Sequence, residues 1–163
     1  MSTKIGDVFQ LTGKYNNYFL HIVAIDELDL FSDVAVLYDI NPLETNEKEL
    51  SKHVVLYTHI FRDEGLKANL WHKIGNIQTK INTKMLLFKN YRDSETIEMA
   101  TDIENADPEW AVWTVGQLKW KTMKYKKGLK LNAEDGGVAP SSDIIYRIDN
   151  GKSLFFKGYE NDL

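Results

Sequence analysis

Short runs of β-branched and aromatic residues, each bounded by Gly, Asn, Asp or Pro, recur along this chain and constrain its fold more than any other feature. Stretches with the apolar period of a helix are scarce, so strands should dominate. The pattern favours an α+β domain that is predominantly antiparallel β, either a bent sheet or a partly open SH3-like barrel with one or two short helices. The predicted strands are Asp7–Thr12, Tyr18–Asp26, Asp33–Asp39, His53–His59, His72–Ile77, Lys84–Tyr91, Trp110–Leu118 with an extension toward Met123, Asp143–Asp149 and Ser153–Tyr159.

Two segments carry helix signals, and two carry turn signals. Asn41 followed by Pro42 is typical of a helix start, which predicts a helix over Leu43–Ser51. A three-residue apolar spacing predicts a second helix over Ser94–Asn105. Asn150-Gly151 is the strongest hairpin signal in the chain and predicts a tight turn between the last two strands. The turn-rich segment Lys127–Asp143 is predicted to be a loop.

The length of 163 residues fits one domain, and we expect it to span residues 1–163. The chain has no cysteine, which excludes disulfides, thiolate metal sites and a cysteine nucleophile. A metal would therefore need histidine and carboxylate ligands, but His21, His53, His59 and His72 lack ligand spacing. We predict no metal and no cofactor, and no catalytic motif for a nucleophile or a phosphate loop is present.

The chain gives no membrane signal. The opening residues MSTKIGDVFQ have no apolar core of signal-peptide length, and the nearly apolar stretch Tyr18–Ile25 is much shorter than the roughly 20 residues of a membrane span. We therefore expect a cytoplasmic protein that does not associate with membranes.

Charge is small in total, at −4, but it is distributed in blocks. Eight acids and one base lie between Asp26 and Glu49, and seven acids and no base lie between Asp93 and Leu118. The next segment, Lys119–Lys130, has six lysines and no acid. A binding partner is therefore expected to interact with these local charged segments rather than with the small total charge.

The Lys119–Lys130 segment, KWKTMKYKKGLK, interleaves Trp120 and Tyr125 with lysines. This composition suits stacking on bases and contact with phosphates, so a nucleic-acid-binding module is one alternative function. The same alternation is typical of an ordinary half-buried strand with lysines on its solvent face, and that interpretation is favoured. A hydrolase with a carboxylate site is a second alternative, because acids are plentiful.

Two segments go beyond generic β patterning. The opening KIGDVFQL and the following YFLHIVAID resemble the start of the bacterial immunity protein 26 family of polymorphic-toxin systems. The later LWHKIGNIQ is similar to that family's Trp-x-x-Ile-Gly-Asn signature. The resemblance covers roughly the first 90 residues. The chain departs from the family pattern at Leu11-Thr12, where Ile-Pro is expected, and at His21, where Gly is expected.

The motif residues also have structural interpretations of their own. Gly6 permits a bend before the first strand, and Gly75 permits a bulge or a close backbone approach. Asn76 can bond its own backbone to set the turn that follows. We therefore interpret the motif residues as structural; they are Gly6, Asp7, Phe9, Trp71, Gly75 and Asn76.

The resemblance implies an immunity protein that binds and neutralises a cognate bacterial toxin by direct protein–protein inhibition, without catalysis and without nucleic acid. Such interfaces combine an aromatic centre with complementary charge. Charge density and aromatic content alone, without any family motif, select the candidate contact residues. These are Glu98, Asp102, Glu104, Asp107 and Glu109, with Trp110 or Trp113 as the aromatic anchor. The other interpretation of the acidic stretch is a solvated helix face.

Overall fold

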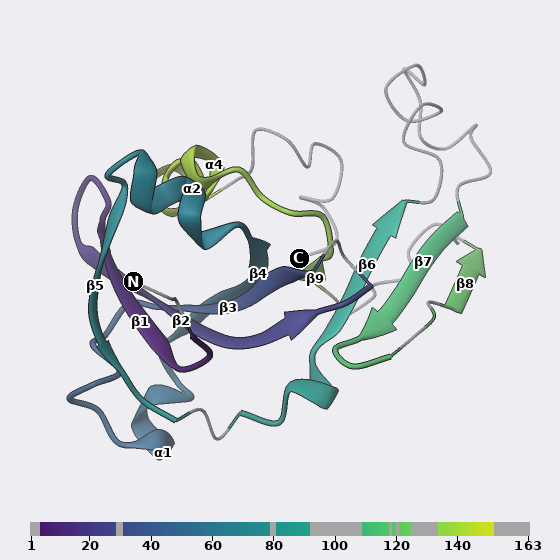
Figure 1. The fold of residues 1–163 in the computed structure, drawn as a ribbon, viewed down its shortest axis with the longest axis horizontal. Coiled ribbons are helices and arrows are strands. Elements are labelled where there is room, and N and C mark those ends of the chain that lie inside the picture. The colour runs from purple at the N-terminus through teal and green to yellow at the C-terminus, as the bar shows by residue number, and fades with distance from the viewer. Residues whose placement is uncertain are drawn as a thin grey trace.

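The computed structural model describes residues 4–28, 31–78, 81–91, 109–117, 119, 121–124 and 134–151. Strands predominate among these residues, and the helices are short (Figure 1). The strands are β1 (Asp7–Thr12), β2 (Asn17–Asp26), β3 (Ser32–Tyr38), β4 (Val54–Ile60), β5 (Trp71–Asn76), β6 (Leu87–Tyr91), β7 (Glu109–Thr114), β8 (Lys121–Lys124) and β9 (Glu134–Asp135). The helical elements are α1 (Glu47–Leu50), α2 (Arg62–Lys67), the 3-10 turn η1 (Thr83–Met85) and α4 (Ser141–Asn150).

Five strands form one antiparallel sheet in the order β4-β3-β2-β1-β5. The first four are consecutive in sequence and form a meander, and β5 joins the free side of β1. A second sheet has the order β8-β7-β6-β9, in which β9 runs parallel to β6. Neither strand order closes on itself, so the sheets are open. The prediction of an α+β fold with mainly antiparallel strands is confirmed.

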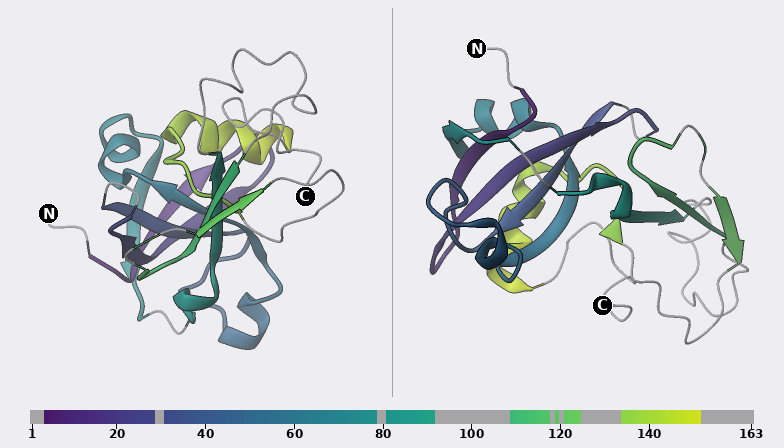
Figure 2. Two further views of the ribbon diagram at one scale, coloured as in Figure 1. Left: turned by 90° about the vertical axis from the view of Figure 1, so that its right-hand side faces the viewer. Right: turned by 90° about the horizontal axis from the view of Figure 1, so that it is seen from below.

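β3 lies inside the larger sheet and is buried along its whole length. Ala35 and Leu37 face a core shared with α2 and α4, whereas Val34, Val36 and Tyr38 face a second core shared with β6 and β7. The two-residue period of a strand sends alternate side chains to opposite faces, so β3 supplies both cores. Figure 1 shows α2 and α4 on one side of the sheet, and Figure 2 shows β6 to β8 beside it from two further directions.

The prediction of a strand at Asp143–Asp149 is wrong, because this segment belongs to the helix α4. Ile144 is fully buried, and Ile145 and Ile148 pack against the same core. A four-residue spacing between Ile144 and Ile148 puts both on one helix face, a signal that the alternation of apolar and polar residues concealed.

The predicted hairpin turn at Asn150-Gly151 is also wrong, since these residues end α4. Gly151 has a left-handed backbone with φ of 69° and donates its N–H to the carbonyl of Arg147. Pro140 stands at the other end, in the N-cap position. Proline at the start and glycine just past the end are typical of a helix, and a left-handed glycine serves a helix end as well as a hairpin.

The predicted helix over Leu43–Ser51 is confirmed only at Glu47–Leu50. Asn46 caps it, because its side-chain oxygen accepts from the N–H of Glu49 at 3.0 Å. The earlier Asn41 instead organises a turn, in which its side chain accepts from the N–H of Leu43 at 3.0 Å. The short helix α2 was not predicted, since it has a single turn and a half and no side-chain cap.

The later strands differ at their ends from the prediction. The segment predicted as Lys84–Tyr91 begins with η1 and becomes a strand at Leu87. The segment predicted as Trp110–Leu118 is a strand only to Thr114, and Gly116 then turns the chain with φ of 84°. Lys121–Lys124 forms a separate antiparallel strand against β7 rather than an extension of it.

Three further predictions meet the limits of the described chain. The helix over Ser94–Asn105 and the strand over Ser153–Tyr159 lie outside the described residues. The loop predicted over Lys127–Asp143 is wrong in its last part, which contains β9 and the first residues of α4. Among the described residues, no helix has the length and the apolar character that crossing a membrane requires.

Candidate functional site

The two family-like motifs lie side by side, because β1 pairs with β5 along Asp7–Leu11 and Trp71–Asn76. The fully buried Asp7 joins them. Its Oδ1 lies 2.6 Å from the Nζ of Lys73 and accepts from the Nδ2 of Asn76 at 2.7 Å. Its Oδ2 accepts from the backbone N–H of Lys4 at 2.9 Å. Burial acts to raise the pKa of Asp7, but these donors outweigh it and hold the pKa below its usual value.

The motif glycines are required by close packing. Gly6 has φ of 93°, and a Cβ on it would meet the carbonyl oxygen of Ile77 at 2.6 Å. Gly75 lies under Leu43, whose nearest methyl group would be 2.6 Å from an added Cβ. The pairing shifts register between Val8 and Phe9 opposite this glycine, in agreement with the predicted bulge, and the atoms that approach Gly75 closely belong to the Leu43 side chain rather than to a backbone. Asn76 differs from expectation, because its side chain bonds across to Asp7 rather than to its own backbone.

The remaining motif side chains build the core. Phe9 is fully buried, and Trp71 packs directly against Gly65 of α2. The indole N–H of Trp71 donates to the carbonyl of Arg62 at 3.1 Å. These motif residues therefore contribute to joining β1, β5 and α2. Phe9 and Trp71 are buried, whereas Asn76 is exposed.

Three exposed apolar residues lie at or just beyond the ends of β2, β3 and β4 on the same side of the larger sheet's strand order, and we call them the apolar tip: Ile25, Phe31 and Phe61. Ile25 pairs with Asp33, and Asp33 pairs with Ile60, so one row crosses three strands. Phe31 immediately precedes β3, two residues before that row, and Phe61 immediately follows β4, one residue beyond the row, at the N-cap position of α2. Their exposed fractions are 41% for Ile25, 71% for Phe31 and 44% for Phe61.

Phe31 also has an unusual backbone, with φ of 56°. A bulky non-glycine residue in this region is an outlier, and such outliers gather at functional sites. Sequence reasoning missed the apolar tip because its three residues are distant in sequence and meet only through strand register. The local signal was the apolar Phe31 within the acidic Asp26–Glu49 stretch, in LDLFSD.

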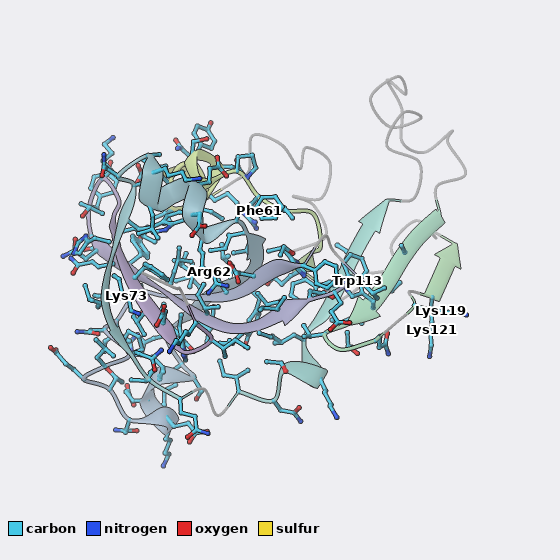
Figure 3. All side chains as sticks on the ribbon, viewed as in Figure 1. Phe61, Arg62, Lys73, Trp113, Lys119 and Lys121 are labelled. Carbon is cyan, nitrogen blue, oxygen red and sulfur yellow. The ribbon has the colours of Figure 1, made fainter. Side chains whose placement is uncertain are left out.

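Charged residues surround the apolar tip. Glu27 and Asp63 are exposed beside it. Arg62 is mostly buried, and its Nε lies 2.7 Å from the Oδ2 of Asp33, so this cation is already paired (Figure 3). Burial raises the pKa of Asp33 in spite of Arg62, and the nearby Asp63 adds to that rise. The described surface around the tip is therefore acidic and suits a basic partner.

A buried polar cluster links the two sheets at the base of the tip. The Oδ2 of Asp26 accepts from the Nε2 of His59 at 2.9 Å and from the Nε1 of Trp113 at 2.7 Å. Burial acts to raise the pKa of Asp26, but these two bonds and one from the N–H of Leu28 together lower it. Asp26 and His59 are fully buried, so a substrate cannot reach this pair in the observed structure.

The structure describes the predicted contact residues to different extents. Trp113 (labelled in Figure 3) is 5% exposed, and its indole N–H donates to Asp26. Its role as an aromatic anchor stays a prediction. Glu109 and Trp110 lie in β7, and only their backbone is described. The other four acids, Glu98, Asp102, Glu104 and Asp107, lie outside the described residues, and their role stays a prediction.

The basic stretch Lys119–Lys130 is described only in part. Lys119 and Lys121 are exposed, and β8 is the edge strand of the second sheet (Figure 3). Lysines on an edge strand discourage pairing with other chains, which agrees with the favoured interpretation of this stretch. Trp120 and Tyr125 lie outside the described residues, so the nucleic-acid alternative stays a prediction. Within the described ranges no three His, Asp or Glu residues are grouped to hold a metal ion.

Comparison with protein-family models, with curated proteins and with solved structures finds no match to this chain. The class that the fold defines is therefore an open, mainly antiparallel α+β domain, and its function has to be argued from the residues themselves.

Proposed function

We propose that this chain is an immunity-type inhibitor, which binds a toxin protein and blocks it by direct contact. The single observation that carries the proposal furthest is the apolar tip. Three large apolar side chains lie exposed at one end of the sheet, and exposed apolar surface is typical of a protein-binding site. Phe31, with its strained backbone, would be the central aromatic contact.

The acidic residues near the tip indicate that a partner with a basic face would fit. A toxin with a basic face would be steered toward Glu27 and Asp63 and would then bury the apolar side chains. The acidic stretch that includes Asp102, Glu104 and Asp107 would extend the same charge. The sequence resemblance is a second reason for the proposal, and it is independent of the apolar tip.

The test is co-expression of this chain with the toxin encoded beside its gene. We expect restored growth and a complex that survives purification. Phe31→Ala combined with Phe61→Ala should lower affinity at least about 30-fold, since truncating two central contacts costs about 2 kcal/mol or more. The matched control is Tyr15→Ala, because Tyr15 is 76% exposed but lies in the β1–β2 turn, at the other end of β2.

One result would contradict the inhibitor function, and another would contradict only the choice of contact surface. A chain that neither rescues growth nor forms a complex is not an inhibitor of that toxin. If the complex forms but the Phe31/Phe61 variant and the Tyr15 variant bind equally well, the inhibitor assignment stands and the apolar tip is not its contact surface.

A further inference from the structure

The side chain of His53, which immediately precedes β4, contacts both α1 and the end of β3. Its Nδ1 lies 2.8 Å from the Oδ1 of Asp39, the residue after β3. Its Nε2 lies 3.5 Å from the Oε1 of Glu49 in α1. The three side chains are partly exposed, at 33% for His53, 50% for Asp39 and 45% for Glu49. Both ring nitrogens therefore face a carboxylate at a place that solvent protons reach.

This arrangement fits the charged form of the ring. A carboxylate only accepts hydrogen bonds, whereas a neutral imidazole has one N–H donor and one acceptor nitrogen. Only the doubly protonated ring can direct an N–H at Asp39 and at Glu49 together. In the neutral ring, one nitrogen lone pair would face a carboxylate oxygen and be repelled by it. Because the contact with Glu49 is the longer of the two, we expect the neutral ring to keep its proton on Nδ1, toward Asp39, and to lose Glu49.

The other charges of this region keep Glu49 an anion. Lys52 lies beside it, with its Nζ 2.7 Å from the Oε2 of Glu49. The Nζ of Lys52 above all, and His53 to a smaller degree, hold the pKa of Glu49 below its usual value. Glu47 and Lys48 complete the charges of α1. Between pH 5 and pH 8 the group that changes its charge in this contact is therefore the histidine.

The single turn of α1 depends on contacts outside itself, because it has four residues and isolated helices shorter than about 12 residues are marginal in water. The N–H of Leu50 donates to the carbonyl of Asn46 at 2.9 Å, and the N–H of His53 donates to the carbonyl of Leu50 at 3.0 Å. The side chain of Leu50 packs against the second core, and Figure 1 shows α1 on the other side of the larger sheet from α2 and α4. Among these attachments, only the contact of the His53 ring changes with pH in this range.

We propose that His53 is a pH-sensitive clasp: its doubly protonated ring holds Glu49 of α1 to Asp39 at the end of β3, and its neutral ring releases Glu49. The clasp is closed toward pH 5 and open toward pH 8, so α1 frays as pH rises. Phe31 and Phe61 of the apolar tip lie at the opposite ends of β3 and β4. The inference therefore does not depend on the inhibitor function.

The test is NMR spectroscopy of the full chain at pH 5 and pH 8. Long-range ¹⁵N–¹H spectra of the ring should show both nitrogens of His53 protonated at pH 5 and only Nδ1 protonated at pH 8. The ¹³Cα resonances of Lys48 and Leu50 should move toward their values in an unfolded chain over the same range. We expect the population of frayed α1 to rise about two- to fivefold, the range that exposed ion pairs give.

Two variants separate the ring from the other contacts of α1. His53→Gln should remove the difference in the α1 resonances between pH 5 and pH 8, because glutamine does not titrate. Lys52→Ala is the matched control, since it removes the other cation beside Glu49 and leaves His53, so the pH dependence should persist. The proposal would be overturned by α1 resonances that do not change with pH in the natural chain, or that change equally in His53→Gln. A neutral ring protonated on Nε2, or a pH dependence lost in Lys52→Ala, would overturn it as well.

Discussion

At the scale of single residues, the ionised state of Asp7 depends on the three groups that donate to it where β1 pairs with β5. Asp7 stays ionised in a buried place because Lys73, Asn76 and the N–H of Lys4 all donate to it. This role was visible in sequence only as a short Gly-Asp-Val-Phe motif. The partners could not be predicted, because Asn76 and Lys73 reach Asp7 through a strand pairing that joins residues almost seventy positions apart.

We predict that Asp7→Asn lowers the free energy of unfolding at pH 7 by about 1–3 kcal/mol, since Lys73 loses its buried anionic partner. The folded pKa of Asp7 lies below the ordinary value of 3.8, so its stabilisation is present above 3.8 and is lost as pH falls through the folded pKa. Urea unfolding at several pH values should show that the difference in the free energy of unfolding between the variant and the natural chain becomes smaller below pH 3.8.

The control for Asp7 is an ion pair of similar length on the surface. Lys52 and Glu49 lie 2.7 Å apart but are well exposed, so Lys52→Ala should change stability by less than about 1 kcal/mol. A loss for Asp7→Asn no larger than this, or one that does not vary with pH, would contradict the role given to Asp7.

At the scale of elements, strands were predicted well and the last helix was not. β1 to β5 alternate apolar and polar residues or contain continuous β-branched runs, and their predicted ranges agree with the observed ones within a residue or so. For α4 the same apolar residues fit both a strand and a helix, and the tertiary contacts of Ile144, Ile145 and Ile148 decide. The sequence signal for the helix was the pair Pro140 and Gly151, which are residue types typical of a helix start and a helix end.

Because Gly151 ends α4 with a left-handed backbone, we predict that Gly151→Ala destabilises the chain by about 1 kcal/mol. Gly151→Asn should cost less, because asparagine tolerates this conformation. No atom of the described residues lies within 4 Å of a Cβ built on Gly151, so the comparison concerns backbone conformation rather than packing against the described chain. Thermal unfolding measures the difference, and equal midpoints for the two variants would mean that the left-handed end does not matter.

At the scale of the whole molecule, the Asp26 cluster connects the two sheets. Asp26 belongs to β2 and His59 to β4 of the larger sheet, whereas Trp113 belongs to β7 of the smaller one. Sequence reasoning placed Trp113 at an interface because it is aromatic and follows acids. The structure shows an interface of another kind, between the two sheets of one chain. The apolar tip likewise depends on strand register, which no local pattern encodes.

We predict that Trp113→Phe lowers stability at pH 7 by about 2–4 kcal/mol, from the lost charge-assisted hydrogen bond and a partly emptied indole site. The pKa of Asp26 should rise toward its ordinary value, since one of its donors is gone. The deficit of the variant should therefore shrink as pH falls below 3.8. Hydrogen exchange should quicken in β6 and β7 before β2 and β3, and uniform quickening would contradict the role of the Asp26 cluster in connecting the two sheets.

The strand order also has a consequence for how the chain folds during synthesis. β1 to β4 form a meander of neighbours in sequence, so they can pair as soon as they leave the ribosome. β1 nevertheless keeps one side open until β5 has been made, and the contact of Asp7 with Asn76 forms last in this sheet. The motif unit is therefore the closing step of the larger sheet, and the nascent chain exposes the unpaired edge of β1 until residue 76 has emerged.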